Sequence, residues 1–171
     1  VTFEDEFNPL NQDQARRGAI LHEFVHALQH MYCACGDSMP KPIWYAEGLA
    51  EFLSAEAGRV PRDRISRLAQ ILRSDKREIF LSSLEDLVAA PGYGEVIMRA
   101  ALRARQKGVQ VGPDKVQEFQ GGALDAFYAQ ASATVYFLHE GQDGKYRRQF
   151  LDYMKAAQTG ASGWEPFSKA F

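Results

Sequence analysis

Ten residues near the start of the chain, LHEFVHALQH at positions 21–30, contain an H-E-x-x-H motif. In a helix, side chains four residues apart project from one face, so the imidazoles of His22 and His26 can reach the same metal ion. Glu23 lies about 100° around this helix, where its carboxylate can contact a water on the metal without being a ligand. The motif therefore predicts a helix that binds zinc and supports hydrolysis.

The residues around the motif favour that helix. Apolar side chains recur at helical spacing in a broad stripe, formed by Ile20, Leu21, Phe24, Val25 and Leu28. Asn11 or Asp13 can cap the N-terminus. We therefore expect residues 11–32 to form a core helix.

A catalytic zinc site needs a third protein ligand. His30 shares the helical face but lies about 12 Å along the axis from His22, too far to bind the same ion. His139 has no supporting pattern. Glu47 is the better candidate, because it sits in the apolar segment WYAEGLAEF at positions 44–52, where a carboxylate needs a partner. An exposed glutamate favoured by the helix dipole is an equally good interpretation of Glu47 alone.

The rest of the chain is predicted to be helical, with little strand signal. Further helices are expected at residues 43–57, 62–74, 83–89, 95–107, 123–140 and 145–157. Ser82-Ser83-Leu84-Glu85 is typical of a capping box. The polar, glycine-rich residues 108–122 are expected to form a loop, and Val109 to Val111 are too short a patch for a strand.

Two further local features have simple expected roles. Gly48 would let its helix pack closely against the motif helix. A basic run is most simply interpreted as a solvated helix face. That run consists of Arg59, Arg62, Arg64, Arg67 and Arg73.

Composition limits the classes of function. The length of 171 residues suits one domain, which we place at residues 1–171. A formal net charge of −2 argues against a nucleic-acid surface. No apolar run approaches the roughly 20 residues of a transmembrane segment. Cys33 and Cys35, one residue apart, are expected to be two reduced thiols. The oligomeric state is not determined by these features.

The two motif segments together carry a family resemblance. H-E-x-x-H followed by WYAEGLA at positions 44–50 resembles the gluzincin metallopeptidases, and in particular the peptidase-MA-like families related to the aminopeptidase N group. The resemblance implies a mainly α, zincin-like catalytic domain with one zinc ion per chain. It also implies His22, His26 and Glu47 as the ligands and Glu23 as the general base, with a peptide or protein as substrate.

The resemblance reaches two more residues. Tyr128 begins the segment YAQAS at positions 128–132, which looks like the segment whose tyrosine donates a hydrogen bond to the oxyanion in these families. Tyr128 as a packed aromatic residue is the plainer interpretation. Glu51 follows Glu47 by one helical turn and is our candidate to accept the other ring N–H of His22, although a solvated glutamate is nearly as good an interpretation.

The chain also departs from the family. A β-sheet normally precedes the motif helix, but only a stub of a strand, at Val1 to Phe3, can be expected here. The chain is then either a piece of a longer protein, or its substrate cleft is built in another way. Nothing resembles the G-x-M-x-N segment that binds a free amine, so an endopeptidase is favoured over an aminopeptidase.

Three hypotheses follow, in order of preference. The first is a zinc-dependent peptidase. The second is a catalytically inactive, zinc-binding module that binds a protein partner. The third is a helical scaffold with an accidental motif and no zinc.

Overall fold

The computed structural model describes residues 9–32, 42–55 and 62–171, and the regular structure in these ranges is helical throughout. The elements are α1 (Pro9–Tyr32), α2 (Ile43–Ser54), α3 (Arg62–Arg73), α4 (Arg77–Phe80), α5 (Leu84–Ala89), α6 (Tyr93–Gln106), the 3-10 helix η1 (Pro113–Lys115), α7 (Val116–Gly144), α8 (Arg147–Gln158) and α9 (Trp164–Ala170). The prediction of a mainly α fold is confirmed for these residues.

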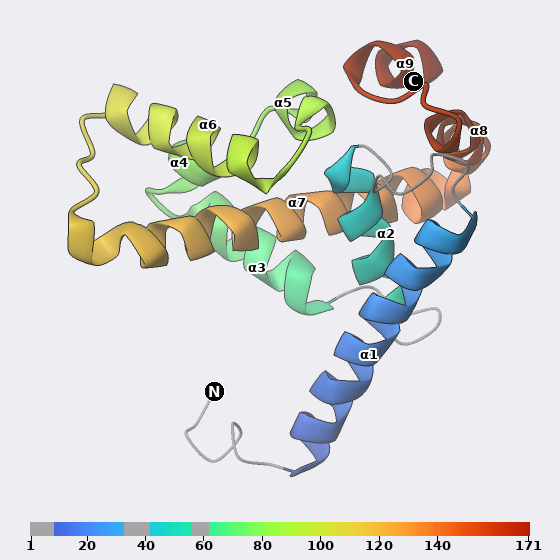
Figure 1. Ribbon diagram of the computed structural model, residues 1–171, viewed down its shortest axis with the longest axis horizontal. Coiled ribbons are helices and arrows are strands. Elements are labelled where there is room, and N and C mark those ends of the chain that lie inside the picture. Colours follow the sequence, from blue (N-terminus) through green and yellow to red (C-terminus); the bar gives the residue numbers. More distant parts are fainter. Residues whose placement is uncertain (1–8, 33–41, 56–61) are drawn as a thin grey trace.

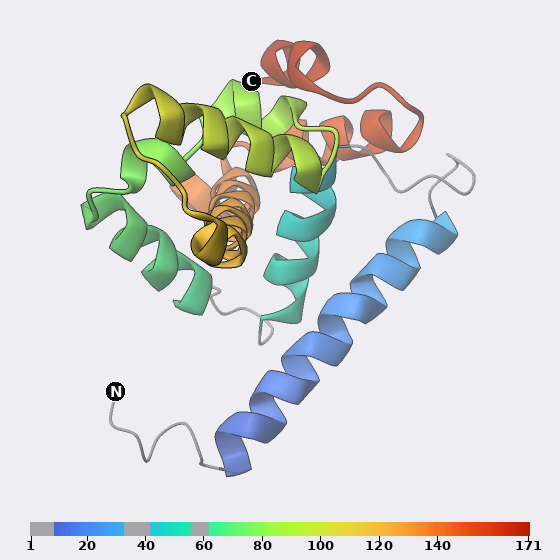
Figure 2. The ribbon, with the colours of Figure 1, turned by 60° about the vertical axis from the view of Figure 1, so that its left-hand side comes forward.

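The long helix α7 runs through the middle of the molecule (Figures 1 and 2). Helices α2, α3 and α6 pack along α7, and α8, the next helix in the chain, contacts it as well. Its buried face combines small residues with large ones, such as Ala131 beside Phe127 and Val135, so that neighbouring helices can approach closely. Fully buried Trp44 and Phe150 extend this core towards α2 and α8.

The start of α7 corrects one prediction, because residues 116–122 are helical rather than part of a loop. Gly122 in this segment permits close packing. A Cβ on Gly122 would meet Cζ of Phe80 at 3.1 Å, and the Phe80 ring lies 5.4 Å from that of Phe119. The other end agrees with expectation, since the backbone leaves helical geometry at Gly141.

The capping interaction of α5 lies one residue later than predicted. Ser83, not Ser82, is the N-cap, and its Oγ accepts a hydrogen bond from the backbone N–H of Asp86 at 3.0 Å. The backbone of Ser82 is already engaged by α7: its N–H donates to Oε1 of Gln130 at 2.8 Å, and its carbonyl accepts from Nε2 of Gln130 at 2.9 Å.

Gly48 permits a close approach, but not to the predicted partner. A Cβ at this position would lie 2.6 Å from the carbonyl oxygen of Ala131 and 2.7 Å from Cγ2 of Val135, both on α7. The expectation that Gly48 packs against the motif helix is therefore wrong. Because the Gly48 side of α2 faces α7, the neighbouring residue Glu47 can face α1.

The prediction that the motif helix is a core helix is also wrong. Ile20, Phe24 and Met31 are 69%, 57% and 73% exposed, and of the described apolar side chains on α1 only Val25 is buried. Helix α1 packs chiefly on α2, and its N-terminal half projects away from the other helices (Figures 1 and 2). One neighbouring helix covers only a narrow part of a broad apolar stripe, so most of the stripe faces outward.

Several predictions concern residues outside the described ranges. These are the strand stub at Val1 to Phe3, the thiols of Cys33 and Cys35, and Arg59 at the start of the basic run. Among the helices that are described, none is both long and apolar enough to cross a lipid bilayer.

Candidate metal centre

Three side chains from two helices converge on one point. His22 and His26 lie one turn apart on α1, and Glu47 comes from the buried start of α2. The Nε2 atoms of the two histidines are 3.0 Å apart, and each lies 3.3 Å from Oε2 of Glu47. The structure thus brings together the three residues that the sequence predicts as ligands, in a group that could hold a metal ion.

The spacing of these atoms fits a tetrahedral zinc site. Zinc binds imidazole nitrogen and carboxylate oxygen at about 2.0–2.1 Å, so two of its ligand atoms are roughly 3.3 Å apart. The three observed separations of 3.0, 3.3 and 3.3 Å are close to this value. If these three side chains bound a zinc ion, a fourth tetrahedral position would stay open, as in catalytic rather than structural zinc sites.

The other ring nitrogen of each histidine faces a polar side chain. Nδ1 of His26 lies 3.0 Å from Oε1 of Gln29, and the Gln29 amide donates to the carbonyl of Ala46 on α2 at 3.1 Å. Nδ1 of His22 lies 3.5 Å from Oε1 of Glu51, the contact that the sequence predicts. With Nδ1 protonated in both rings, both Nε2 lone pairs point at the shared position.

Glu47 is 2% exposed and is held as a carboxylate by its neighbours. Burial acts to raise its pKa, but hydrogen bonds with His22 and Tyr93, together with the electrostatic influence of the two histidines, outweigh burial and lower the pKa below the usual value. The pKa of His22 is raised, chiefly by its hydrogen bond to Glu47. A charged, buried ligand beside two imidazoles is typical of a site for a divalent cation.

Tyr93, the first residue of α6, was not predicted as part of the site. Its hydroxyl donates a hydrogen bond to Oε1 of Glu47, the oxygen that does not face the histidines. Burial, followed by the contact with Glu47, raises the pKa of Tyr93, so the phenol stays protonated and remains a donor. The hydroxyl of Tyr128 in turn donates to that of Tyr93 at 3.4 Å.

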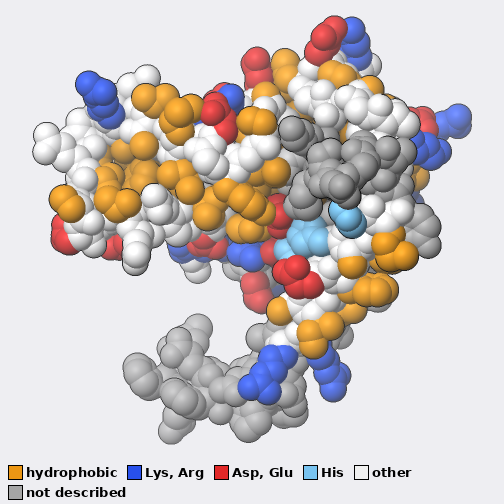
Figure 3. Space-filling view, in the orientation of Figure 1, with side chains coloured by type: hydrophobic (Ala, Val, Ile, Leu, Met, Phe, Trp, Pro, Cys, Tyr) orange, Lys and Arg blue, Asp and Glu red, His pale blue; other side chains and the backbone are white. Residues whose placement is uncertain are grey.

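These residues line a cavity of about 280 Å³. Its walls are His22, Glu23, His26, Glu47, Tyr93 and Tyr128. Glu23 is exposed at its edge and contributes to the raised pKa of His22, which places its carboxylate near that ring. On the face drawn in Figure 3, histidine atoms reach the surface with acidic side chains beside them. The cavity therefore combines the predicted ligands, base and oxyanion donor.

The two remaining histidines are elsewhere. His30 is exposed near the end of α1. His139 lies near the end of α7, where Nδ1 is 2.8 Å from Oε1 of Glu140 and the ring packs on Phe52. Neither belongs to the metal-binding group found among the described residues.

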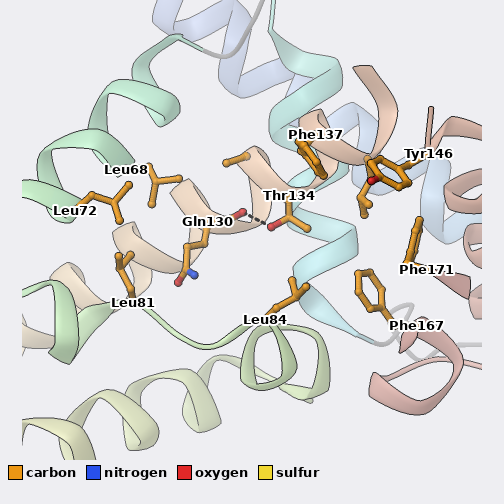
Figure 4. A pocket seen from close by; sticks show the side chains of 12 residues that line it. Leu68, Leu72, Leu81, Leu84, Gln130, Thr134, Phe137, Tyr146, Phe167 and Phe171 are labelled. Carbon is orange, nitrogen blue, oxygen red and sulfur yellow. Dashed lines mark hydrogen bonds between the residues drawn. The ribbon is translucent and has the colours of Figure 1, made fainter. Parts of the chain in front are cut away.

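A second, larger cavity of about 500 Å³ has a different character (Figure 4). Leucine and phenylalanine side chains from α3, α7 and α9 surround it, and no carboxylate, imidazole or thiol of a described residue lines it. Two of its polar residues are paired within the protein: the Gln130 side chain binds the Ser82 backbone, and the Thr134 hydroxyl donates to the Gln130 backbone carbonyl at 2.8 Å. The groups able to bind a metal or transfer a proton are thus in the smaller cavity.

Comparison with known proteins adds no assignment. No protein-family model, curated protein or solved structure matches the chain.

Proposed function

We propose that the chain is a zinc-dependent peptidase with a zincin-like arrangement of its motif helices. The observation that carries the proposal is the set of three ligand atoms, 3.0–3.3 Å apart, in one cavity with a carboxylate and two phenols. The resemblance of the H-E-x-x-H and WYAEGLA segments to the gluzincins supports zinc and peptide hydrolysis in particular.

Each residue has a distinct part in the proposed reaction. A zinc ion held by His22, His26 and Glu47 would supply Lewis acidity, to acidify a water molecule and polarise a carbonyl group. Glu23 accepts a proton from the attacking water and passes it to the leaving amine. Tyr128 donates a hydrogen bond to the oxyanion that develops on the substrate, a contribution of about 3 kcal/mol for a single donor in other enzymes.

Endopeptidase activity is the form we favour. The sequence has no counterpart of the segment with which aminopeptidases bind a free amine. The carboxylates of the site, Glu23, Glu47 and Glu51, are engaged by the roles and contacts already described. A diverse library of peptides with free and acetylated N-termini distinguishes the two forms, because an endopeptidase cleaves both sets.

The decisive test compares the zinc-loaded protein with its Glu23→Gln variant. We expect the wild type to cleave the library, to lose cleavage with a chelator and to regain it with added zinc. Glu23→Gln should bind zinc normally and cleave at least a hundred-fold more slowly, because general-base catalysis contributes about 10²–10⁴. Full activity in Glu23→Gln would exclude the assigned base.

The zinc content of the same samples separates the alternatives. A protein that binds one zinc ion but cleaves no peptide would contradict the proposal and favour a non-catalytic binding module. A protein that binds no zinc would leave a helical scaffold with an accidental motif.

A further inference from the structure

Arg64, on α3, contacts two residues beside the metal centre, Glu51 and Tyr128. Its Nε donates to Oε2 of Glu51 at 2.9 Å and its Nη2 to Oε1 of Glu51 at 2.7 Å. Its Nη1 donates to Oδ1 of Asp125 at 3.3 Å. Its guanidinium carbon also lies 5.2 Å from the centre of the Tyr128 ring. One side chain therefore connects α2, α3 and α7 beside the cavity.

The contact with Glu51 determines where that carboxylate lies. A glutamate on a helix surface has several rotamers, and ordering its side chain has an entropic cost. The two parallel hydrogen bonds from Arg64 select one rotamer, in which Oε1 lies 3.5 Å from Nδ1 of His22. Hydrogen bonding to Glu51 raises the pKa of Arg64, so the guanidinium stays charged. The orientation of the His22 ring thus depends on a residue of α3.

The contact between Arg64 and Tyr128 restricts the position of the Tyr128 ring. A guanidinium within about 6 Å of a ring centre is attracted to the ring face. Arg64 covers one face of the Tyr128 ring. The centre of the Tyr93 ring lies 6.3 Å from the centre of the Tyr128 ring. The hydroxyl of Tyr128 is thereby directed to Tyr93 and the cavity.

We propose that Arg64 is a positioning residue, which holds Glu51 against His22 and the Tyr128 ring against the cavity. The expectation of a solvated basic face is wrong for this residue, whose side chain is 31% exposed and fully engaged. The inference rests on the proposed zinc site. The additional point is that a residue of α3 contributes to the zinc affinity of a site whose ligands lie on α1 and α2.

Arg67 offers a matched control on the same helix. It also binds Asp125, through Nε, but its other hydrogen bond goes to Gln70 rather than to Glu51. Arg67→Gln therefore removes a positive charge and an Asp125 contact while leaving Glu51 in place. Competition with a chromophoric chelator measures the zinc affinity of each protein, and thermal unfolding of the zinc-free proteins measures their stability.

We expect Arg64→Gln to bind zinc about ten-fold or more weakly than the wild type, because loss of a partner behind a ligating histidine typically costs about 10–100-fold. Arg67→Gln should stay within about two-fold of the wild type, in the range of exposed ion pairs. Equal affinities for the Arg64→Gln and Arg67→Gln variants would overturn the inference.

A double-mutant cycle tests whether Arg64 acts through Glu51. In a Glu51→Gln background, Arg64→Gln should cost less than about two-fold in further zinc affinity. A full, additive loss there would overturn the proposed route. If Arg64→Gln does not fold, Arg64→Lys decides, because a lysine keeps the charge but not the two parallel hydrogen bonds. Wild-type zinc affinity in Arg64→Lys would contradict the inference, and an affinity reduced at least three-fold would support it.

The zinc measurement also separates this inference from the proposed function. A wild type that binds zinc without cleaving peptides disproves the function alone. A wild type that binds zinc and cleaves peptides, with Arg64→Gln matching Arg67→Gln, disproves the role of Arg64 alone. A wild type that binds no zinc disproves both.

Discussion

Tyr93 donates its hydroxyl hydrogen to Oε1 of Glu47, while Oε2 of the same carboxylate lies 3.3 Å from Nε2 of both His22 and His26. The two oxygens of Glu47 therefore face different partners. With Oε1 engaged by a phenol, the carboxylate offers one oxygen to a metal. The contact with Tyr93 thus restricts the orientation of the Glu47 carboxylate and leaves Oε2 as the oxygen that faces the histidines.

Replacing Tyr93 by Phe should weaken zinc binding by about 10–100-fold, since the partner of a ligating carboxylate is lost. Competition with a chelator measures the change. Tyr136→Phe is the control, because its ring packs on Phe52 and it does not line the cavity. Unchanged affinity in Tyr93→Phe would show that Glu47 is oriented by its helix alone.

Replacing either His26 by Ala or Glu47 by Gln should remove bound metal. The wild type is expected to carry one zinc ion per chain by elemental analysis after dialysis, and each variant well below one. His30→Ala should retain the full amount, because His30 is exposed outside the group. One zinc ion per chain in Glu47→Gln would rule out Glu47 as a ligand.

The metal-free protein should gain most stability from His22 and Glu47 between about pH 4.5 and 6.5. The raised pKa of His22 means that its contribution is complete below the unperturbed value of 6.5 and is lost as pH rises through the folded-state pKa. The lowered pKa of Glu47 means that its contribution is complete above 4.5 and is lost as pH falls through the folded-state pKa.

Chemical denaturation of the metal-free protein over this pH range tests the linkage. The free energy of unfolding of the wild type should fall relative to that of His22→Gln as pH rises above 6.5. Parallel pH profiles for the two proteins would contradict the assigned pair. Zinc binding should follow the opposite trend and strengthen as His22 loses its proton, because only the neutral imidazole ligates.

Gly48→Ala should destabilise the protein by about 1–3 kcal/mol, the usual cost of overpacking. The added Cβ would meet the Ala131 carbonyl oxygen at 2.6 Å, and a backbone atom cannot rotate away. Gly121→Ala, on the exposed side of α7 with no atom within 4 Å of the added Cβ, is the control. It should stabilise by up to about 1 kcal/mol through helix propensity. Equal melting temperatures for the two variants would exclude close packing at Gly48.

The ligand residues could be predicted because each is tied to local sequence. His22 and His26 are four residues apart, a spacing that any helix converts into proximity. Glu47 could be proposed because a carboxylate in an apolar segment needs a partner. Gln29 was overlooked, although it follows His26 by three residues and the same helical rule would have indicated it.

The partners behind the ligands could not be predicted in the same way. Tyr93 and Glu47 are 46 residues apart, and nothing in the segment around Tyr93 distinguishes it from a packed aromatic residue. Arg64 looked like one of several surface arginines. The exposure of α1 was missed for a related reason, since an apolar stripe shows that a face can be buried but not which element covers it.

The division of the ligands between α1 and α2 has a mechanical consequence. Among the described elements, helix α1 packs chiefly on α2, and much of its apolar stripe is exposed, so its attachment depends on this one pairing. An ion bound by His22 and His26 on α1 and by Glu47 on α2 would cross-link the two helices. Removing the ion would then weaken the attachment of α1 to α2. Because His22, Glu23 and His26 all lie on α1, they would move away from Glu47 together.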